Sequence, residues 1–332
     1  MKEISWIERN ERQYLKDIVP LETPLSVQIE PTGACNFKCI YCYHSLGKSK
    51  QRPYKNMPLD LYEKFINESK NFSQKYKSLI FCGGGEPLLS KDIYRMITLA
   101  KEISNEVAII TNGSLLTKEV SNKLIASGID TIRISLQGLN SDDYYKTCGV
   151  KLDFEKFLIN LDYLNKNKNQ AKIVLKIPNI ALDTKEKKDL FHKLFKNKCD
   201  SITIQTISPL VDDLDYTNMQ PDGQKSLYGE EIKPMKVCPQ IFYTLVIDQN
   251  GKIAPCSDSY YNNNFPEIGD LNENTIQEIW NSKRLKELRK FHLLGRRFDL
   301  KTCQNCQHVL PLNNKFDNLD NDCKSIIERM GF

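Results

Sequence analysis

The chain has 332 residues, of which 40% are hydrophobic and 27% are charged, as in an ordinary globular protein rather than a disordered one. Its 47 lysines and arginines exceed its 42 aspartates and glutamates by only five, which gives no indication of a nucleic-acid-binding protein. No run of apolar residues is long enough to predict a membrane span. The length favours one large domain with a smaller appended one.

The first structural signal is an alternation of short β-branched runs with helical stretches. We expect strands at residues 25–30, 78–82, 107–111, 131–137, 172–177 and 201–207. We expect helices at residues 59–74, 91–103, 118–127, 154–167 and 185–196, preceded by a helix over residues 4–18. Repeated β–α units of these lengths predict an α/β fold with a parallel sheet, and six units predict a partial (β/α)6 TIM-like barrel.

Several of these strands have one apolar face and one polar face. In the fourth strand, Ile132 and Ile134 alternate with Arg133 and Ser135. Parallel strands covered by helices on both sides are continuous apolar runs, so a polar face indicates a barrel lumen that holds water or a polar ligand. An antiparallel sheet with one wet face is the alternative, and the helices between the strands disfavour it.

The C-terminal part has a different pattern. Residues 211–234 are rich in Asp, Asn, Gly and Pro and predict a linker. A hairpin is expected between residues 242–248 and 252–254 around Asn250-Gly251, followed by helices at residues 275–281 and up to about residue 291. The predicted division is an N-terminal helical extension over residues 1–23, a barrel over 24–210, the linker, and a small β-hairpin-plus-helix domain over 235–332.

Eleven cysteines are the unusual feature of the composition. The charged first ten residues lack the apolar core of a secretory signal, so we expect a cytoplasmic protein, in which cysteines are more often metal ligands or catalysts than disulfides. Three lie within residues 35–42 and five lie beyond residue 237. The isolated Cys82, Cys148 and Cys199 are expected to pack as small buried hydrophobes.

The first cysteine set follows the first predicted strand directly. Thiolates as close as those of Cys35, Cys39 and Cys42 either share a metal centre or remain unused. Structural zinc would need a fourth ligand, for which His44 is available. A cubane iron–sulfur cluster would need only the three cysteines and would leave one iron open to an exogenous ligand.

This CxxxCxxC array, with Tyr41 before its third cysteine, resembles that of the radical S-adenosylmethionine (radical SAM) superfamily. Residues 83–87, Gly-Gly-Gly-Glu-Pro, resemble the GGEP motif of the same family. The resemblance implies a SAM-binding [4Fe–4S] cluster on Cys35, Cys39 and Cys42. In this family an electron from the cluster cleaves SAM to methionine and a 5′-deoxyadenosyl radical, which abstracts a hydrogen atom from the substrate.

The resemblance also implies a set of SAM contacts. The two middle glycines let the backbone approach the ligand, the region of Glu86 offers acceptors for the SAM ammonium, and Tyr41 should lie near the adenine. Lys146 stands where many relatives have an arginine, and Gln137 replaces a common aspartate. A lysine keeps the charge but loses the bidentate fork. The expected cofactor-binding residues are Tyr41, Gly84, Gly85, Glu86, Asn112, Ser135 and Lys146.

The second cysteine set resembles the auxiliary-cluster domain called SPASM or, in its short form, twitch. Twelve residues separate Cys238 from Gly251, and four separate Gly251 from Cys256, as in the opening motif of that domain. The resemblance implies one auxiliary [4Fe–4S] cluster, with Cys323 as either a further ligand or a spare thiol. A four-cysteine zinc ribbon is the alternative. The expected ligands are Cys238, Cys256, Cys303 and Cys306.

The three histidines outside the first loop give no functional signal in the sequence. His192 and His292 lie in charged helical stretches, and His308 is expected on the surface two residues beyond Cys306.

These motifs predict a radical SAM oxidoreductase that dehydrogenates a hydroxylated small molecule, such as a sugar or aminocyclitol, with the auxiliary cluster as electron acceptor. Lys176 or Arg133 is a candidate base if desolvated, although a structural role is the plainer reading of each. Ribosomal-peptide modification, such as thioether formation, epimerisation or maturation, is the alternative, which the short segment before the first strand disfavours. A non-catalytic zinc-binding module is a remote third reading. The expected partners are a small-molecule or peptide substrate and an electron donor such as flavodoxin or ferredoxin.

Overall fold

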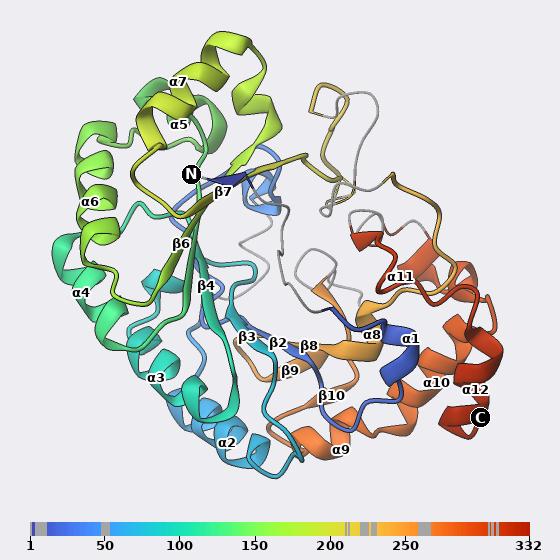
Figure 1. Cartoon of the computed structure of the whole chain (residues 1–332). Helices are drawn as coiled ribbons and strands as arrows, with labels where there is room; N and C mark the ends of the chain where they lie inside the picture. Colours follow the sequence, from blue (N-terminus) through green and yellow to red (C-terminus); the bar gives the residue numbers. More distant parts are fainter. Residues whose placement is uncertain are drawn as a thin grey trace.

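One mixed sheet organises the described part of the chain (Figure 1). The computed structural model describes residues 2–3, 12–47, 54–209, 211, 213–219, 226, 231–257, 267–304, 306, 309 and 312–332. The strand order is β1-β7-β6-β5-β4-β3-β2-β8-β9-β10. The strands are β1 (Lys2–Glu3), β2 (Ser26–Ile29), β3 (Ser78–Phe81), β4 (Val107–Thr111), β5 (Thr131–Ser135), β6 (Lys172–Pro178), β7 (Ser201–Gln205), β8 (Thr244–Ile247), β9 (Lys252–Ala254) and β10 (Gly269–Asp270).

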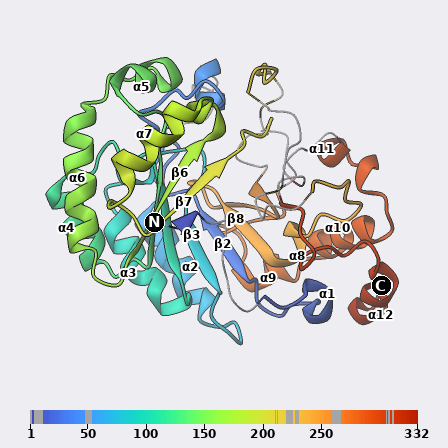
Figure 2. The same cartoon turned by 45° about the horizontal axis from the view of Figure 1, so that its top comes forward.

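Helices cover the outer face of the curved parallel part of this sheet (Figures 1 and 2). Strands β2 to β7 are parallel neighbours, and β1 and β10 form the two edges, so the sheet is not closed. The predicted α/β fold with a partial barrel is therefore confirmed. The helices of this part are α2 (Leu59–Ser69), α3 (Ile93–Ile103), α4 (Lys118–Ala126), α5 (Ser141–Cys148), α6 (Phe154–Asn167) and α7 (Lys185–Phe195).

The alternating strand pattern has the expected physical consequence. Ile132 and Ile134 of β5 are fully buried in the core between sheet and helices, whereas Arg133 and Ser135 on the opposite face are only half-buried. Helix starts follow local capping, as where the Asp153 carboxylate accepts the Lys156 backbone N–H at the start of α6. The polar face of the strands thus lines the lumen, as predicted.

Three elements differ from the sequence-based expectation. The described part of the predicted first helix is helical only over α1 (Leu15–Ile18), and residues 4–11 of that prediction lie outside the described residues. Strand β1 was not predicted, because a two-residue strand has no periodicity to detect; it pairs in parallel with β7. The polar helix α5 was also not predicted.

The C-terminal part continues the same sheet. Strand β8 pairs in parallel with β2, and β9 returns antiparallel to β8 through Asn250-Gly251, where Gly251 has φ +86°. The predicted hairpin is therefore confirmed, and it adds directly to the barrel strands. The remaining helices are α8 (Gln240–Tyr243), α9 (Ile276–Trp280), α10 (Lys283–Leu293), α11 (Lys301–Gln304) and α12 (Cys323–Met330).

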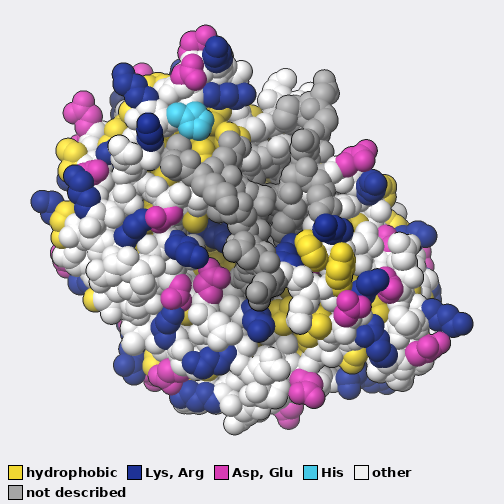
Figure 3. Space-filling view, viewed as in Figure 1, with side chains coloured by type: hydrophobic (Ala, Val, Ile, Leu, Met, Phe, Trp, Pro, Cys, Tyr) yellow, Lys and Arg dark blue, Asp and Glu magenta, His cyan; other side chains and the backbone are white. Residues whose placement is uncertain are grey.

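Charged side chains of both signs share one face of the molecule. On the face in Figure 3, Lys and Arg side chains are interspersed with Asp and Glu side chains. Within the described residues, no helix combines the length and apolar character that crossing a membrane requires.

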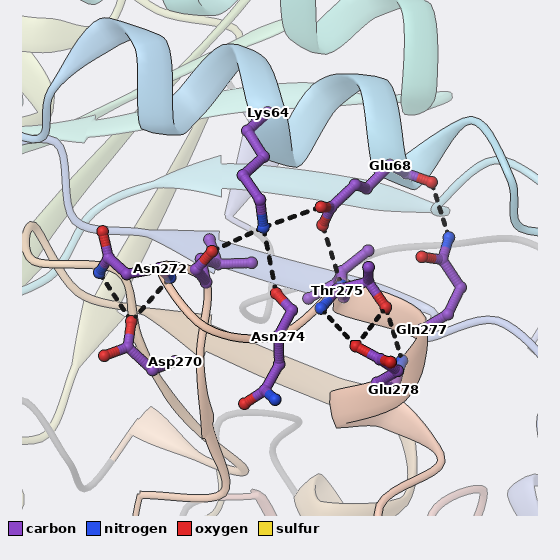
Figure 4. A network of polar contacts seen from close by, with 10 residues as sticks. Lys64, Glu68, Asp270, Asn272, Asn274, Thr275, Gln277 and Glu278 are labelled. Carbon is purple, nitrogen blue, oxygen red and sulfur yellow. Dashed lines mark hydrogen bonds and ion pairs between the residues drawn. The ribbon is translucent and has the colours of Figure 1, made fainter.

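Helix α2 fastens the barrel to the segment around α9 (Figure 4). Lys64 Nζ donates to the backbone oxygens of Leu271 (2.6 Å) and Asn274 (3.1 Å). The Glu68 carboxylate pairs with Lys64 at 2.8 Å and accepts the backbone N–H of Ile276, the first residue of α9, at 3.1 Å. An anion at a helix N-terminus satisfies a donor that has no partner within the helix.

We predict that Glu68→Ala lowers the free energy of unfolding by about 1–2 kcal/mol, since it removes a charged hydrogen bond to a helix N-terminus. Urea denaturation of the anaerobically purified protein measures the change. The matched control is Glu63→Ala on the same helix. Glu63 pairs with Arg95 at 3.4 Å with both side chains exposed, so its loss should cost less than about 0.5 kcal/mol. Equal effects of the two variants would contradict the interpretation.

Candidate functional site

The loop after β2 presents the first three cysteines at the edge of the sheet. The C-terminal end of α5 holds this loop, because the backbone N–H of Lys38 donates to Cys148 O (3.0 Å) and that of Ile40 donates to Thr147 O (2.9 Å). The loop is therefore ordered by a helix that arrives from the end of β5.

The three thiols share one electrostatic environment. The pKa of Cys35 is raised to about 12, mainly by burial and to a smaller extent by Glu86, Cys42 and Cys148, although a hydrogen bond from the Phe37 N–H opposes the rise. The pKa of Cys39 is also raised, mainly because its thiol lies against that of Cys148. As the side chains stand in the described residues, no three His, Cys, Asp or Glu groups are arranged to hold a metal ion. Binding of a metal cluster requires these thiols to lose their protons.

The glycine turn after β3 packs directly on the cysteine loop. A Cβ atom at Gly85 would lie 2.0 Å from Thr32 O and 2.7 Å from Ala34 O. The Glu86 backbone N–H donates to Ala34 O at 2.7 Å, and the Gly84 N–H donates to Glu30 Oε1 at 2.6 Å. From the motif, these glycines are expected to let the backbone approach the ligand; at Gly85 the close approach is to the cysteine loop itself.

The carbonyl oxygen of Gly84 is also occupied. It accepts a hydrogen bond from Tyr43 Oη at 2.7 Å and another from His44 Nε2. His44 therefore uses its Nε2 nitrogen on the glycine turn, which disfavours it as the fourth ligand of a zinc ion.

Glu86 connects the glycine turn to the next strand end. Its buried carboxylate accepts hydrogen bonds from Thr111 Oγ1 (2.6 Å), the Asn112 N–H (2.7 Å) and the Leu88 N–H (3.1 Å). Burial raises the pKa of this carboxyl, while these three donors lower it. Asn112 extends the connection, since its Nδ2 donates to Asn36 Oδ1 of the cysteine loop at 2.8 Å.

The remaining expected SAM contacts lie at and beyond the end of β5. Tyr41 Oη donates to the side-chain oxygen of buried Gln137, and Gln137 Nε2 donates to Ser135 O at 3.3 Å. The glutamine that replaces the usual aspartate thus positions the tyrosine of the cysteine loop. Lys146 lies on the exposed side of α5, and its contact with SAM stays a prediction.

A cavity of about 170 Å³ opens beside the third cysteine. Lys176 of β6 reaches it from the lumen, and Tyr41, Cys42, Gln205 and Ile207 line other parts of it. The pKa of Lys176 is lowered to about 8, mainly by burial and next by the positive charge of Arg133, while Cys39 and Cys82 oppose this. The cavity therefore combines a cluster-ligand candidate with an amine that is partly neutral near physiological pH.

In the second cysteine set, Cys303 and Cys306 lie close enough to Cys238 to influence its pKa. Burial raises the pKa of Cys238 to about 12, with a further contribution from Cys306 and Cys303, whereas the charge of Arg297 opposes it. Cys256 is buried just after β9, and its neighbour Ser257 donates from its N–H to Gln240 Oε1 at 3.4 Å, two residues beyond Cys238. The hairpin and α8 thus bring the two sequence-distant segments together.

The four cysteines outside the two predicted ligand sets lie in different parts of the fold. Cys199 and Cys148 are buried as expected, but Cys148 also lies against Cys39, a contact that the sequence did not reveal. Cys82 is half-buried, and its thiol donates to Gln28 in the lumen. The Cys323 thiol donates to Leu319 O at 3.4 Å within its own turn, which favours a spare thiol over a ligand.

His292 of α10 is the functional candidate that the sequence analysis missed. It is fully buried, and it contacts both Cys238 and Cys303. The sequence gives no signal of these contacts, because they depend on how the chain folds around α10. His308 lies outside the described residues.

Comparisons with known proteins cover both cysteine sets. The family model of the radical SAM superfamily matches residues 29–194, and that of the SPASM iron–sulfur cluster-binding domain matches residues 238–307. The AdoMet-dependent heme synthase of Methanosarcina barkeri is 28% identical over 149 residues, which are 45% of this chain and 41% of that protein. The chain therefore spans less than half the length of this curated relative.

Two solved structures show the same fold. BtrN in complex with AdoMet and 2-DOIA has a TM-score of 0.57 at 20% identity, covering 88% of this chain and 97% of its own. SuiB of Streptococcus suis bound to the precursor peptide SuiA has a TM-score of 0.62 at 19% identity, covering 93% of this chain and 77% of its own.

We predict that Gly85→Ala removes the iron bound by the first cysteine set, because its Cβ would displace the backbone of residues 32–34. Iron content and the visible charge-transfer band of the reconstituted protein measure the loss.

The control for this variant is Gly47→Ala in the same loop. Gly47 has φ +66° but open space around its Cβ position, so the substitution should cost about 1 kcal/mol and leave the iron content unchanged. Full iron content in Gly85→Ala would contradict the close-approach argument.

Proposed function

Because the chain belongs to the radical SAM superfamily and carries a C-terminal SPASM domain, we propose that it dehydrogenates a hydroxylated small molecule such as a sugar or aminocyclitol. Membership of these families makes the protein an enzyme. Its cofactors are SAM, a [4Fe–4S] cluster that binds SAM, and auxiliary iron–sulfur in the SPASM domain. The observation that carries the finer proposal is the cavity that joins Cys42 to Lys176 in a polar lumen.

The cysteines assigned to the two clusters fit them chemically. Cys35, Cys39 and Cys42 provide three thiols on one loop, and the second set provides four, those of Cys238, Cys256, Cys303 and Cys306, and all of them lie outside disulfides. When bound, the first cluster supplies the electron that cleaves SAM to a hydrogen-abstracting radical, and the auxiliary cluster supplies an acceptor for the electron that the substrate loses.

Lys176 is the proposed general base. Removal of a hydrogen atom from a carbon that bears a hydroxyl leaves a radical that becomes a carbonyl by losing one proton and one electron. The neutral amine of Lys176 accepts that hydroxyl proton and becomes an ammonium ion. Burial, and after it the positive charge of Arg133, lowers the pKa of Lys176 to about 8, so part of the amine is neutral at physiological pH.

The small size of the cavity supports a small substrate. Hydrophobic Leu136 and Ile207 and polar Gln205 and Ser208 share its walls with Lys176. A few polar groups on an otherwise apolar wall are typical of sites that orient a small ligand.

Peptide modification is the second candidate. It is supported by the likeness to SuiB bound to its precursor peptide, which shares the fold over 93% of this chain. Turnover of a sugar or aminocyclitol, as opposed to a precursor peptide, distinguishes the two, with a flavodoxin or ferredoxin as the proposed electron donor in either case.

We predict that the turnover rate rises with pH through about 8, the pKa of Lys176. Below this pH the amine is protonated and cannot accept a proton; above it the amine is neutral. The neutral fraction, and with it the rate, should increase about fivefold from pH 7 to pH 8. The Lys176→Met variant should lose about 10²–10⁴-fold in turnover and show no such pH dependence.

The control for this prediction is Lys172→Met, at the exposed start of the same strand. It should keep both the rate and the pH profile of the unsubstituted enzyme. An unchanged profile in Lys176→Met would exclude Lys176 as the base.

We predict that Cys39→Ala abolishes SAM cleavage, whereas Cys256→Ala spares cleavage and stops substrate oxidation. Chromatography of 5′-deoxyadenosine and of the oxidised product separates the two activities. Cys199→Ala is the control, because this buried thiol donates only within its own region, to Phe195 O at 3.7 Å, and both activities should persist.

Two results would contradict the proposal. Substrate oxidation in Cys256→Ala would remove the acceptor role of the auxiliary site. Anaerobic reconstitution should give about eight irons per chain, and stoichiometric zinc in their place would refute the enzyme chemistry altogether.

A further inference from the structure

His292 lies between two predicted ligands of the auxiliary cluster. Its side chain is fully buried near the C-terminal end of α10. The backbone N–H of Cys238 donates to His292 Nδ1 at 3.3 Å, and His292 Nε2 lies 3.7 Å from Cys303 Sγ. One imidazole ring thus bridges two cysteines that are 65 positions apart in the chain (303 minus 238).

The first contact determines where the proton of the ring lies. A nitrogen that accepts a hydrogen bond carries no proton, so Nδ1 is unprotonated and the ring is neutral. In a neutral imidazole the other nitrogen then bears the hydrogen. The Nε2–H group is therefore directed at the sulfur of Cys303.

Neighbouring contacts fix the ring in this place. Arg289, one turn earlier on α10, donates from Nε to Ile241 O at 2.9 Å, and its guanidinium lies 4.1 Å from the centre of the Trp280 ring. These contacts hold α10 against α8, directly after Cys238. Turning the buried ring of His292 away would break its hydrogen bond with the Cys238 backbone.

A buried cation reinforces the local field. Arg297 is 3% exposed, and it donates to Met235 O at 2.9 Å and to Cys306 O at 3.3 Å. It therefore contacts the backbone on the N-terminal side of Cys238 and at Cys306. Positive charge and N–H donors near thiolate sulfurs favour the reduced, more negative form of a cluster.

We propose that His292 is a positioning residue that donates its Nε2–H to the Cys303 sulfur and thereby raises the reduction potential of the auxiliary cluster. The inference rests on the proposed function, since it takes Cys238, Cys256, Cys303 and Cys306 as ligands of that cluster. In the one-electron reduction the cluster gains a negative charge, and the hydrogen bond stabilises that charge on sulfur. The histidine makes the auxiliary site a better acceptor for the substrate electron.

The test uses the full-length chain with Cys35, Cys39 and Cys42 replaced by serine, so that only the auxiliary site binds iron. Redox titration followed by electron paramagnetic resonance gives the midpoint potential. His292→Asn keeps an oxygen near Nδ1 for the Cys238 N–H but removes the donor to sulfur. At a fixed applied potential, the ratio of reduced to oxidised cluster should fall about tenfold, equivalent to about 59 mV for one electron.

Two further variants separate a tuning role from a merely structural one. His292→Gln places an amide N–H near the position of Nε2 and should recover most of the lost potential. The control His192→Asn, on exposed α7, should titrate like the parent chain.

The outcomes are distinct. An unchanged potential in His292→Asn with full iron content would overturn the inference. Equal loss of iron in the Asn and Gln variants would also overturn it, because only a structural role would remain. If the parent chain itself takes up no four-iron cluster, the proposed function fails, and the inference about His292 fails with it.

Discussion

The site depends on the close approach of two backbone segments, the glycine turn and the cysteine loop. Strands β2 and β3 are parallel neighbours in register, with Ile29 opposite Phe81, so both loops leave the sheet at the same edge. A Cβ atom at Gly85 would lie 2.0 Å from Thr32 O, so there is no space for a side chain at this position. Hydrogen bonds at Glu86 N and Gly84 N then fasten the turn to the loop and to the lumen. Glu86 also connects the glycine turn to the end of β4, because its carboxylate accepts the Asn112 N–H.

Two carboxylates of this site have a structural role. Glu30 and Glu86 both face backbone N–H donors of the turns, so each serves to hold the loops together. The sequence motif alone did not reveal these contacts of the Glu86 carboxylate, and a role of the Glu86 region in binding the SAM ammonium stays a prediction. A motif gives the residue type at a position, but the partners of that residue are set by the neighbouring strand ends.

Much of the fold follows from the sequence because its signals are local. The alternation of Ile132 and Ile134 with Arg133 reflects burial on one side of one strand. The hairpin turn can be predicted from the dipeptide Asn250-Gly251 alone. Helix α5 escaped detection because its sequence, SDDYYKTC, has no apolar period. His292 escaped it for another reason: α10 reads as a charged surface helix, whereas Arg289 and His292 are buried by partners about fifty positions away.

The strand register places the Lys176 amine in the lumen, where burial lowers its pKa. Lys176 stands between Ser135 of β5 and Thr203 of β7, in the interior of the sheet, and its carbonyl accepts the Leu136 N–H at 2.8 Å. Its backbone is therefore fixed, and its side chain extends along the polar face beside Arg133. Moving a lysine from this position to the exposed start of β6 would restore full hydration and with it the ordinary pKa. Burial of the Lys176 amine costs free energy of folding, because it disfavours the charged form. For the same reason it makes the neutral form, which accepts a proton, accessible near physiological pH.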